Sequence, residues 1–421
     1  MNHLHSTSKS ALVFTFSALS LWSSACSASD SATQPATNVD APENSTTEAL
    51  EPDAPDVLVA NEAGQGASAP AASCSTQELE QKLREIIAGV DARMPTTPGY
   101  LLALRSDDGR IDVAVASPGL DPGASYRVAS IGKTFTAAGV LRLVEQGRLD
   151  LDASVDRVAP APLPELLRSG GYDPRRITVR QLLQHDGGLR DYAESQEYFQ
   201  AVLSDPGHHW TREEQVQLAM RDGQPLSEPG AEYHYSDTGY VLLGAIIEQA
   251  TGSGLGPALR ELLKLDELGL TSTWLETQEP APPGVAAHAP QLLEGADLFS
   301  YDASIDAYGG GGYVSTAREL VSFYRALLTG RVFDQPATLA LMQTVPDVNV
   351  ESHYAMGIEQ VVGDCWGHDG FWGTEAVYCP QQGLGLAVAG MSVESLNYLV
   401  GDIVGPVLRE AAACAAAGVE P

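Results

Sequence analysis

The sequence predicts a mixed α/β (α+β) fold, in which helices flank an antiparallel sheet built from both chain ends and a mainly helical subdomain is inserted. Two observations support this prediction. Strand-like segments lie near the two ends of the body of the chain, at residues 99–104, 111–116, 354–361, 374–378 and 384–389. Between them, about residues 151–300 have helical periodicity interrupted by proline-rich joints. Strands separated by a long helical stretch are typical of one sheet that carries an insertion.

The elements at the two ends of the body follow from short local patterns. Ser75 and Glu78 form the S-x-x-E pattern of a capping box. Apolar residues at mostly helical spacing follow over 79–90 and predict an amphipathic helix with one buried face. A mostly apolar helix follows Ser130, and apolar residues at similar spacing over 396–408 predict the closing helix.

Residues 1–26 predict a secretory signal peptide. A weakly basic start precedes a short apolar run over 11–22 and small residues before Cys26. A cysteine in this position is also typical of a bacterial lipoprotein cleavage site, although Ser23 stands where leucine is usual. Two alternatives therefore stay open: a lipid anchor through Cys26, and plain secretion.

Residues 27–73 predict a disordered acidic linker. The segment contains 8 acidic and no basic residues, and it is rich in alanine, serine, threonine and proline. Such a composition buries too little apolar surface to offset the entropy lost on ordering. We place one folded domain at 74–416. We expect an exported protein that is either secreted, periplasmic or held at the outer membrane as a lipoprotein.

Composition excludes some partners. The chain has 55 acidic and 24 basic residues, and its formal net charge is −31. Because this charge repels phosphate groups, and no basic cluster offsets it, we expect no binding to nucleic acid. We expect a monomer that acts on a small molecule or on a peptidoglycan peptide.

The cysteines fit export. Without Cys26, four of the five cysteines remain. Cys365 and Cys379 flank a predicted hairpin, and Cys74 and Cys414 lie near the two ends of the domain. Two disulfides with these pairings are the preferred interpretation, and four reduced, buried cysteines are the alternative.

The most informative motif is Ser130-Ile131-Gly132-Lys133. On a helix, positions i and i+3 share one face, so the Lys133 amine can reach the Ser130 hydroxyl. Serine is a weak nucleophile until a base lies beside it. The alternative is a capping serine followed by a solvated lysine.

Two other motifs are weaker. The run Gly309–Gly312 lacks the Lys-Ser/Thr of a phosphate-binding loop, which favours a plain backbone turn. The Cys365-x-x-His368 spacing lacks a second pair of metal ligands, and Cys365 has a better partner in Cys379. We expect no metal and no cofactor.

Three motifs in order carry a resemblance to a known family: Ser130-x-x-Lys133, Tyr235-Ser236-Asp237 and His368-Asp369-Gly370. Together with flanking segments, they cover nearly all of 76–410. The chain resembles the serine β-lactamase and penicillin-binding-protein superfamily, and within it the group of class C β-lactamases, D-alanyl-D-alanine carboxypeptidases and esterases. The resemblance implies the β-lactamase/transpeptidase-like fold.

The resemblance also implies roles. Ser130 would be the acylated nucleophile, Lys133 its neighbouring base, and Tyr235 a proton acceptor or relay for Ser130 and the leaving group. Backbone N–H groups of Ser130 and Phe371 would form the oxyanion hole. The implied substrate-binding residues are Asp237, His368, Gly370 and Phe371, with His368 near a substrate carboxylate.

Asp237 departs from the family pattern, in which asparagine is usual. A carboxylate cannot donate to a substrate carbonyl, and it would hold Lys133 protonated, which favours Tyr235 as the working base. We therefore expect an exported serine hydrolase with carboxypeptidase or esterase activity and weak β-lactam hydrolysis. The alternative is a non-catalytic penicillin- or peptidoglycan-binding protein, or a sensor, with the same fold.

Overall fold

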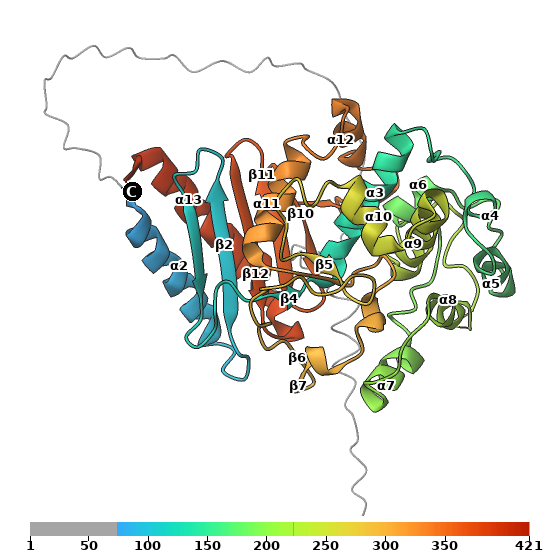
Figure 1. Cartoon of the computed structure of the whole chain (residues 1–421), viewed down its shortest axis with the longest axis horizontal. Helices are drawn as coiled ribbons and strands as arrows, with labels where there is room; N and C mark the ends of the chain where they lie inside the picture. The colour runs from blue at the N-terminus through green and yellow to red at the C-terminus, as the bar shows by residue number, and fades with distance from the viewer. Residues whose placement is uncertain (1–73, 222, 421) are drawn as a thin grey trace, which may run out of the picture.

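The computed structural model describes residues 74–221 and 223–420, so the predicted signal peptide and linker lie outside the described residues. Its centre is a six-stranded antiparallel sheet with the strand order β3-β2-β12-β11-β10-β9. The strands are β2 (Tyr100–Ser106), β3 (Asp112–Ala116), β9 (Glu359–Val362), β10 (Cys365–Gly370), β11 (Thr374–Cys379) and β12 (Leu384–Gly390). The two chain ends meet where β2 pairs with β12, which confirms the predicted fold class (Figure 1).

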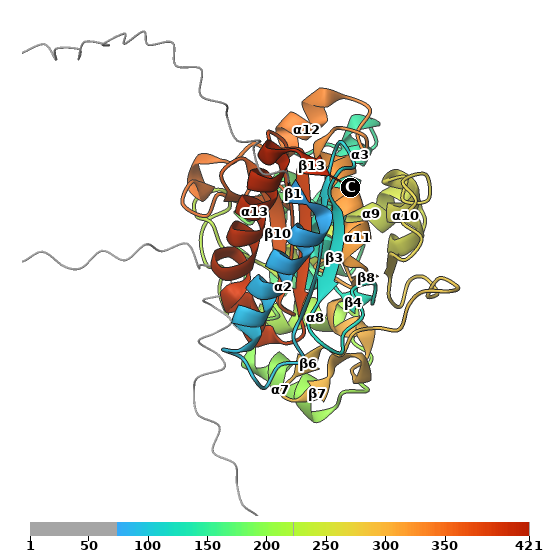
Figure 2. The ribbon, with the colours of Figure 1, turned by 90° about the vertical axis from the view of Figure 1, so that its left-hand side faces the viewer.

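Helices α2 (Thr76–Asp91) and α13 (Gly405–Ala417) lie side by side on one face of this sheet (Figure 2). Successive side chains along each strand point to opposite faces of the sheet, so a single strand contributes to the hydrophobic clusters on both faces. On β2, for example, Leu102 and Leu104 pack into the cluster under α2 and α13, whereas Leu101 and Ala103 pack into the larger cluster on the other face.

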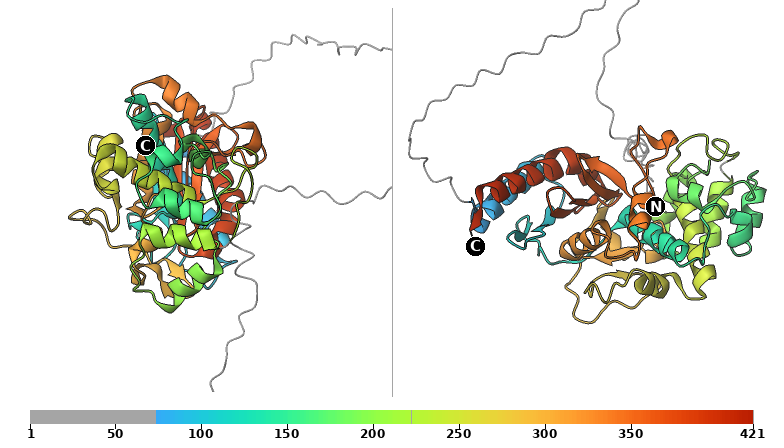
Figure 3. Two further views of the ribbon diagram at one scale, coloured as in Figure 1. Left: turned by 90° about the vertical axis from the view of Figure 1, so that its right-hand side faces the viewer. Right: turned by 90° about the horizontal axis from the view of Figure 1, so that it is seen from above.

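The other face carries α11 (Ala317–Leu328), which packs across β2, β11 and β12. Beyond it lie α3 (Gly132–Glu145), α12 (Pro336–Met342) and the helical region, on the opposite side of the sheet from α2 and α13 (Figure 3). The helices of that region are α4 (Val155–Val158), α5 (Leu163–Ser169), α6 (Val179–Gln184), α7 (Gln196–Ser204), α8 (Arg212–Arg221), α9 (Asp237–Thr251) and α10 (Leu255–Leu262).

The helical region ends earlier than the expected boundary near residue 300. After Leu262 the chain forms short strands and 3-10 turns instead. Two small sheets lie in or border this part: β4 (Tyr126–Arg127), β8 (Tyr313–Ser315) and β5 (Trp274–Leu275) in one, and β6 (Leu292–Leu293) with β7 (Ala296–Asp297) in the other. The first of them leads directly into the segment that holds Ser130.

The predicted strand at 354–361 is wrong in its first half. Only β9 is a regular strand there, and Tyr354 makes a single isolated bridge to Glu359. Gly357 lies between them with φ of 70°, and a side chain at this glycine would lie 2.8 Å from the carbonyl oxygen of Lys133. The chain turns here because it passes close over the start of α3.

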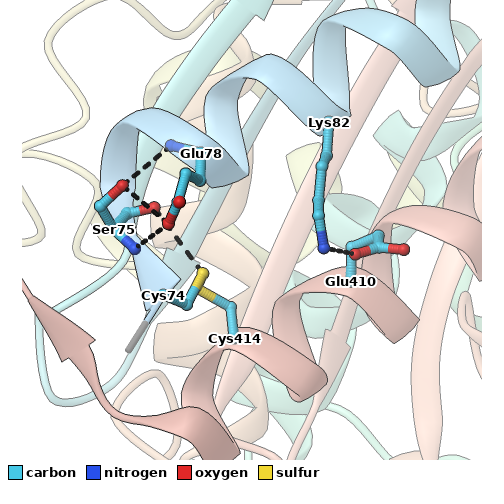
Figure 4. Close-up of a disulfide and its surroundings, with 6 residues drawn as sticks. All are labelled: Cys74, Ser75, Glu78, Lys82, Glu410 and Cys414. Carbon is cyan, nitrogen blue, oxygen red and sulfur yellow. Dashed lines mark hydrogen bonds and ion pairs between the residues drawn. A yellow bond between two sulfur atoms is a disulfide. The ribbon is translucent and has the colours of Figure 1, made fainter. Parts of the chain in front are cut away.

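Both predicted disulfides form, Cys74–Cys414 and Cys365–Cys379. The first lies beside the predicted capping box, in which the backbone N–H groups of Ser75 and Glu78 each bond to the other residue's side chain (Figure 4).

Strand β1 (Cys74–Ser75) pairs in parallel with β13 (Val419–Glu420), so the ordered fold continues past residue 416. Within the described part of the chain, no helix is long and apolar enough to cross a membrane.

Candidate active site

Ser130 lies in a one-turn 3-10 helix, Ala129–Ile131, that leads into α3. Ala129 has a φ of 51°, in the left-handed region that non-glycine residues seldom adopt. Strained backbone of this kind is concentrated at functional sites, where the surrounding structure holds it in place. The turn leaves Ser130 partly exposed while both neighbours are buried, so its hydroxyl is accessible from a pocket.

Lys133 is fully buried one turn further along the same helix. Its Nζ donates to Oγ of Ser130 at 2.8 Å and to the carbonyl oxygen of Gly310 at 2.9 Å, and it forms an ion pair with Asp237. Three acceptors thus surround a nitrogen that carries three hydrogens in its protonated form. The geometry is that of an ammonium group held against a serine hydroxyl.

The glycine run Gly309–Gly312 is a turn that packs against α3. A Cβ on Gly132 would lie 2.7 Å from Cα of Gly311, so this contact requires two glycines facing each other. The close approach lets the carbonyl of Gly310 accept from Lys133, and the carbonyl of Gly309 accept from Thr136 at 2.8 Å. Sequence reasoning identified the turn but not its contact with Lys133.

Tyr235 lies just before α9, and Asp237 is the first residue of that helix. Nζ of Lys133 lies 4.9 Å from the centre of the Tyr235 ring, so the ammonium group faces both residues. The ion pair with Lys133 joins α9 to α3 at the point where the hydroxyl of Ser130 enters the pocket. Ser130, Tyr235 and Asp237 all line this pocket.

Two residues that sequence reasoning gave no catalytic role hold this segment in place. The N–H of Ser236 donates to Nδ1 of His185 at 3.0 Å, and the N–H of Asp237 donates to Asp191 at 3.0 Å. The His185 ring packs on that of Tyr235, with centres 4.2 Å apart. Burial lowers the pKa of His185 well below its usual value, so the ring stays neutral and can accept. No local sequence pattern reveals these contacts, because they join loops about 50 residues apart.

Gly370 ends β10 directly against the Ser130 turn. A side chain there would overlap the carbonyl oxygen of Val128 and the hydroxyl of Thr374, so only glycine fits. The Thr374 hydroxyl also donates to that carbonyl at 2.8 Å. These contacts bring the next residue, Phe371, to the wall of the same pocket as Ser130, as an oxyanion hole requires.

His368 is 1% exposed, and both of its ring nitrogens have partners. Nδ1 donates to the carbonyl oxygen of Asp369 at 2.7 Å, and Nε2 accepts from the hydroxyl of Tyr354 at 3.1 Å. Burial, together with the smaller effect of the charge on Lys133, lowers the pKa of His368 to about 3. The ring is therefore neutral near pH 7, and it offers no positive charge to a substrate carboxylate.

The pocket encloses about 850 Å³ of empty space, including its opening to solvent. It has an aromatic wall made by Tyr192, Tyr198, Phe199, Tyr235, Phe371 and Trp372. Carboxyl groups also line it, from Asp191, Glu194, Asp237, Asp306 and Asp369, whereas none of the described lining residues is lysine or arginine. A ligand here meets aromatic rings and carboxyl groups.

The site defines a class of protein in which a serine hydroxyl, a buried amine and a phenol share one cleft. The Beta-lactamase family model matches residues 88–395, more than half of the chain. The chain therefore belongs to the β-lactamase family, whose members include serine hydrolases such as esterases and amidases.

Three relatives illustrate the range of this family. The chain is 29% identical to "Penicillin-binding protein 4*" of Bacillus subtilis over 218 residues, and the match covers 48% of this chain and 44% of that protein. It is 33% identical to "Esterase EstB" of Burkholderia gladioli over 167 residues, and this match covers 39% of this chain and 41% of that protein. The chain thus spans less than half the length of these two curated relatives. The solved D-stereospecific amidohydrolase from Streptomyces sp. superposes with a TM-score of 0.65 at 29% identity, over 76% of this chain and 98% of that one.

Proposed function

We propose that the protein is an exported serine hydrolase that acts through an acyl-enzyme on Ser130, with esters and amides as substrates. The observation that carries this proposal is the position of Nζ of Lys133, 2.8 Å from Oγ of Ser130 and paired with Asp237. A hydroxyl in contact with a buried cation, at the mouth of an apolar pocket, is suited to attack on a carbonyl carbon.

The Lys133–Asp237 ion pair determines which group can accept the proton of Ser130. Because Lys133 is held as an ammonium group, it has no lone pair with which to take the proton of Ser130. Tyr235 is then the proton acceptor, and the ammonium 4.9 Å from its ring stabilises the phenolate form. Oγ of Ser130 attacks the carbonyl, and the N–H groups of Ser130 and Phe371 donate to the oxyanion. Tyr235 passes the proton to the leaving group, and water then cleaves the ester on Ser130.

The electrostatics of the pocket favour substrates without a carboxylate beside the scissile bond. D-Alanyl-D-alanine peptides and β-lactams carry such a group, and it needs a positive partner in the site. His368 is neutral, and the described residues that line the pocket include several acids but no lysine or arginine. Esters and amides that lack the carboxylate do not need such a partner. Two relatives, one named an esterase and one an amidohydrolase, agree with this choice.

Export is supported by the covalent framework of the domain. Disulfides persist in oxidising compartments, and the structure contains Cys74–Cys414 and Cys365–Cys379. The predicted signal peptide at 1–26 agrees with this, and lipidation of Cys26 is the form of anchoring that we propose.

A non-catalytic sensor of the same fold is the second candidate, and the Lys133–Asp237 ion pair is the observation that favours it, since this pair removes one base. Hydrolysis of p-nitrophenyl acetate distinguishes the two. An enzyme gives steady release of p-nitrophenol that is lost in Ser130→Ala and retained in a control, Ser322→Ala, on the distant helix α11. A single burst of one equivalent without turnover supports the sensor. Release that is the same in wild type and Ser130→Ala contradicts both.

A further inference from the structure

A second groove opens beside the catalytic pocket and shares with it the side chains of Tyr235, Asp369 and Leu396. Three acidic residues on adjacent strands line this groove: Glu359 on β9, Asp369 on β10 and Glu375 on β11. The sheet register brings them together, because Asp369 is opposite Glu375 and Glu359 is opposite Gly367, two residues before Asp369. We call these three residues the carboxyl cluster.

Among the described residues, no lysine or arginine forms an ion pair with the carboxyl cluster, although the charge of Lys133 acts on Asp369 from farther away. Nδ1 of His368 lies 3.7 Å from Asp369, and that ring is neutral. Glu375 is 1% exposed, and its Oε1 is buried without a hydrogen-bond partner. Burial and mutual repulsion raise the pKa of Glu359 to about 8 and burial raises that of Asp369 to about 6. A buried carboxyl group without a hydrogen-bond partner, grouped with two half-buried acids, is costly, so the position of this cluster next to the catalytic pocket requires a functional explanation.

Exposed apolar side chains also line the groove, beside further polar and acidic ones. The described chain has five exposed large hydrophobic residues, and four of them line this groove: Val348, Val350, Val362 and Val400. As in the catalytic pocket, none of the described lining residues is lysine or arginine. An occupant that matches both features has an alkyl body and a positively charged end.

We propose that the groove is a leaving-group subsite, in which the carboxyl cluster binds the ammonium end of an alkylammonium leaving group. This inference rests on the proposed hydrolase function. The groove lies on the side of Tyr235, which donates the proton to the departing group, whereas Ser130 and Phe371 line the other pocket. An organic cation fits better than a metal ion, because no group of three or more acidic, histidine or cysteine side chains in the described residues has the geometry to hold one.

The first test compares two thioesters of equal shape at pH 7. S-(2-dimethylaminoethyl) thioacetate has a cationic leaving group, and S-(3-methylbutyl) thioacetate is its uncharged analogue. Ser130 forms the acyl bond, the C–S bond breaks, and the thiolate takes the proton from Tyr235, so thiol release reports turnover of both.

We expect kcat/KM for the cationic thioester to exceed that for the uncharged one at least tenfold. In Glu375→Gln, and in the less buried Glu359→Gln, the ratio falls toward one while the uncharged thioester keeps its rate. The matched control Glu85→Gln makes the same carboxyl-to-amide change on α2, away from the groove, and leaves the ratio unchanged. Equal kcat/KM values for the two thioesters in the wild type overturn the inference.

The second test is independent of turnover. Calorimetry with Ser130→Ala protein compares n-hexylammonium with 1-hexanol. We expect at least tenfold tighter binding of the ammonium ion, lost when Glu375→Gln is added and retained when Glu85→Gln is added. Equal affinities, or tighter binding of Ca²⁺ or Mg²⁺ than of the alkylammonium ion, contradict the subsite. A wild type that cleaves neither thioester contradicts the proposed function, while the calorimetric comparison still decides the subsite.

Discussion

The ammonium group of Lys133 is buried in an ion pair with Asp237, and the same nitrogen donates to Oγ of Ser130 at 2.8 Å. The carboxylate of Asp237, at the start of α9, holds the charge of Lys133 in place through this ion pair. The proposed nucleophile therefore lies beside a fixed positive charge rather than beside a free amine. In the proposed mechanism, this relationship decides which group takes the proton and which substrates suit the site.

Replacing Asp237 by asparagine removes the charge that holds Lys133 protonated and supplies an amide that can donate to a substrate carbonyl. We expect Asp237→Asn to raise the turnover of a chromogenic cephalosporin about tenfold, equivalent to about 1.4 kcal/mol of transition-state stabilisation. Hydrolysis of p-nitrophenyl acetate should not fall. Asp237→Ala, which removes the charge without adding a donor, is the control. A loss of ester turnover without any gain on the cephalosporin refutes the assignment.

Tyr235→Phe removes the proposed proton acceptor while keeping the ring against His185. General acid–base catalysis contributes about 10²- to 10⁴-fold, so kcat for ester hydrolysis should fall by about that factor with little change in KM. Tyr233→Phe is the matched control and should retain most activity. If Tyr235→Phe keeps the wild-type rate, Lys133 must be the base despite its ion pair.

The neutral state of His368 gives a pH prediction. Its pKa is lowered to about 3 in the folded protein from about 6.5 in the unfolded chain, so the unfolded state binds more protons between these values. The stability that comes from this group is complete above about pH 6.5 and is lost as the pH falls toward 3. Compared with His368→Gln, the wild type should lose up to about 1.4 kcal/mol more per pH unit in this range, measured by urea unfolding at pH 7.5, 5.5 and 4.5. Parallel pH profiles for the two proteins are inconsistent with a buried, neutral imidazole.

The two disulfides should differ in their effect on stability. The sequence separation that the disulfide closes is 340 residues for Cys74–Cys414 and 14 residues for Cys365–Cys379. On the chain-entropy model, this difference makes the long-loop bridge more stabilising by about 2–3 kcal/mol. Unfolding in guanidinium chloride of Cys74→Ala/Cys414→Ala and of Cys365→Ala/Cys379→Ala checks the order. A larger loss from the second pair means that hairpin packing, rather than chain entropy, dominates.

Local patterns predicted much of the fold. The capping box at Ser75 and Glu78 forms as expected, and the strand-like segments at 99–104, 374–378 and 384–389 match β2, β11 and β12. The prediction of a strand at 354–361 was wrong in its first half, because the apolar residues there are buried in a turn over α3. Burial alone does not distinguish a turn from a strand. The Ser130–Lys133 contact was predictable because it joins residues one helical turn apart.

The surroundings of the site were not predictable in the same way. The contact of Asp191 with the N–H of Asp237, and that of Gly310 with Lys133, join segments whose approach depends on the packed tertiary structure. The carboxyl cluster depends on strand register, since a shift of one residue would turn Glu375 to the other face of the sheet. The neutral state of His368 likewise follows from its burial, which a motif does not reveal.

Trapping the acyl-enzyme tests the central claim most directly. The protein is mixed with a fluorescent fluorophosphonate, which reacts with activated serine hydroxyls, and the modified peptide is located by mass spectrometry. The account predicts one equivalent of label on Ser130, slowed at least 100-fold by Tyr235→Phe in keeping with the loss of a general base. Label on another residue, or labelling that persists unchanged in Ser130→Ala, would contradict it.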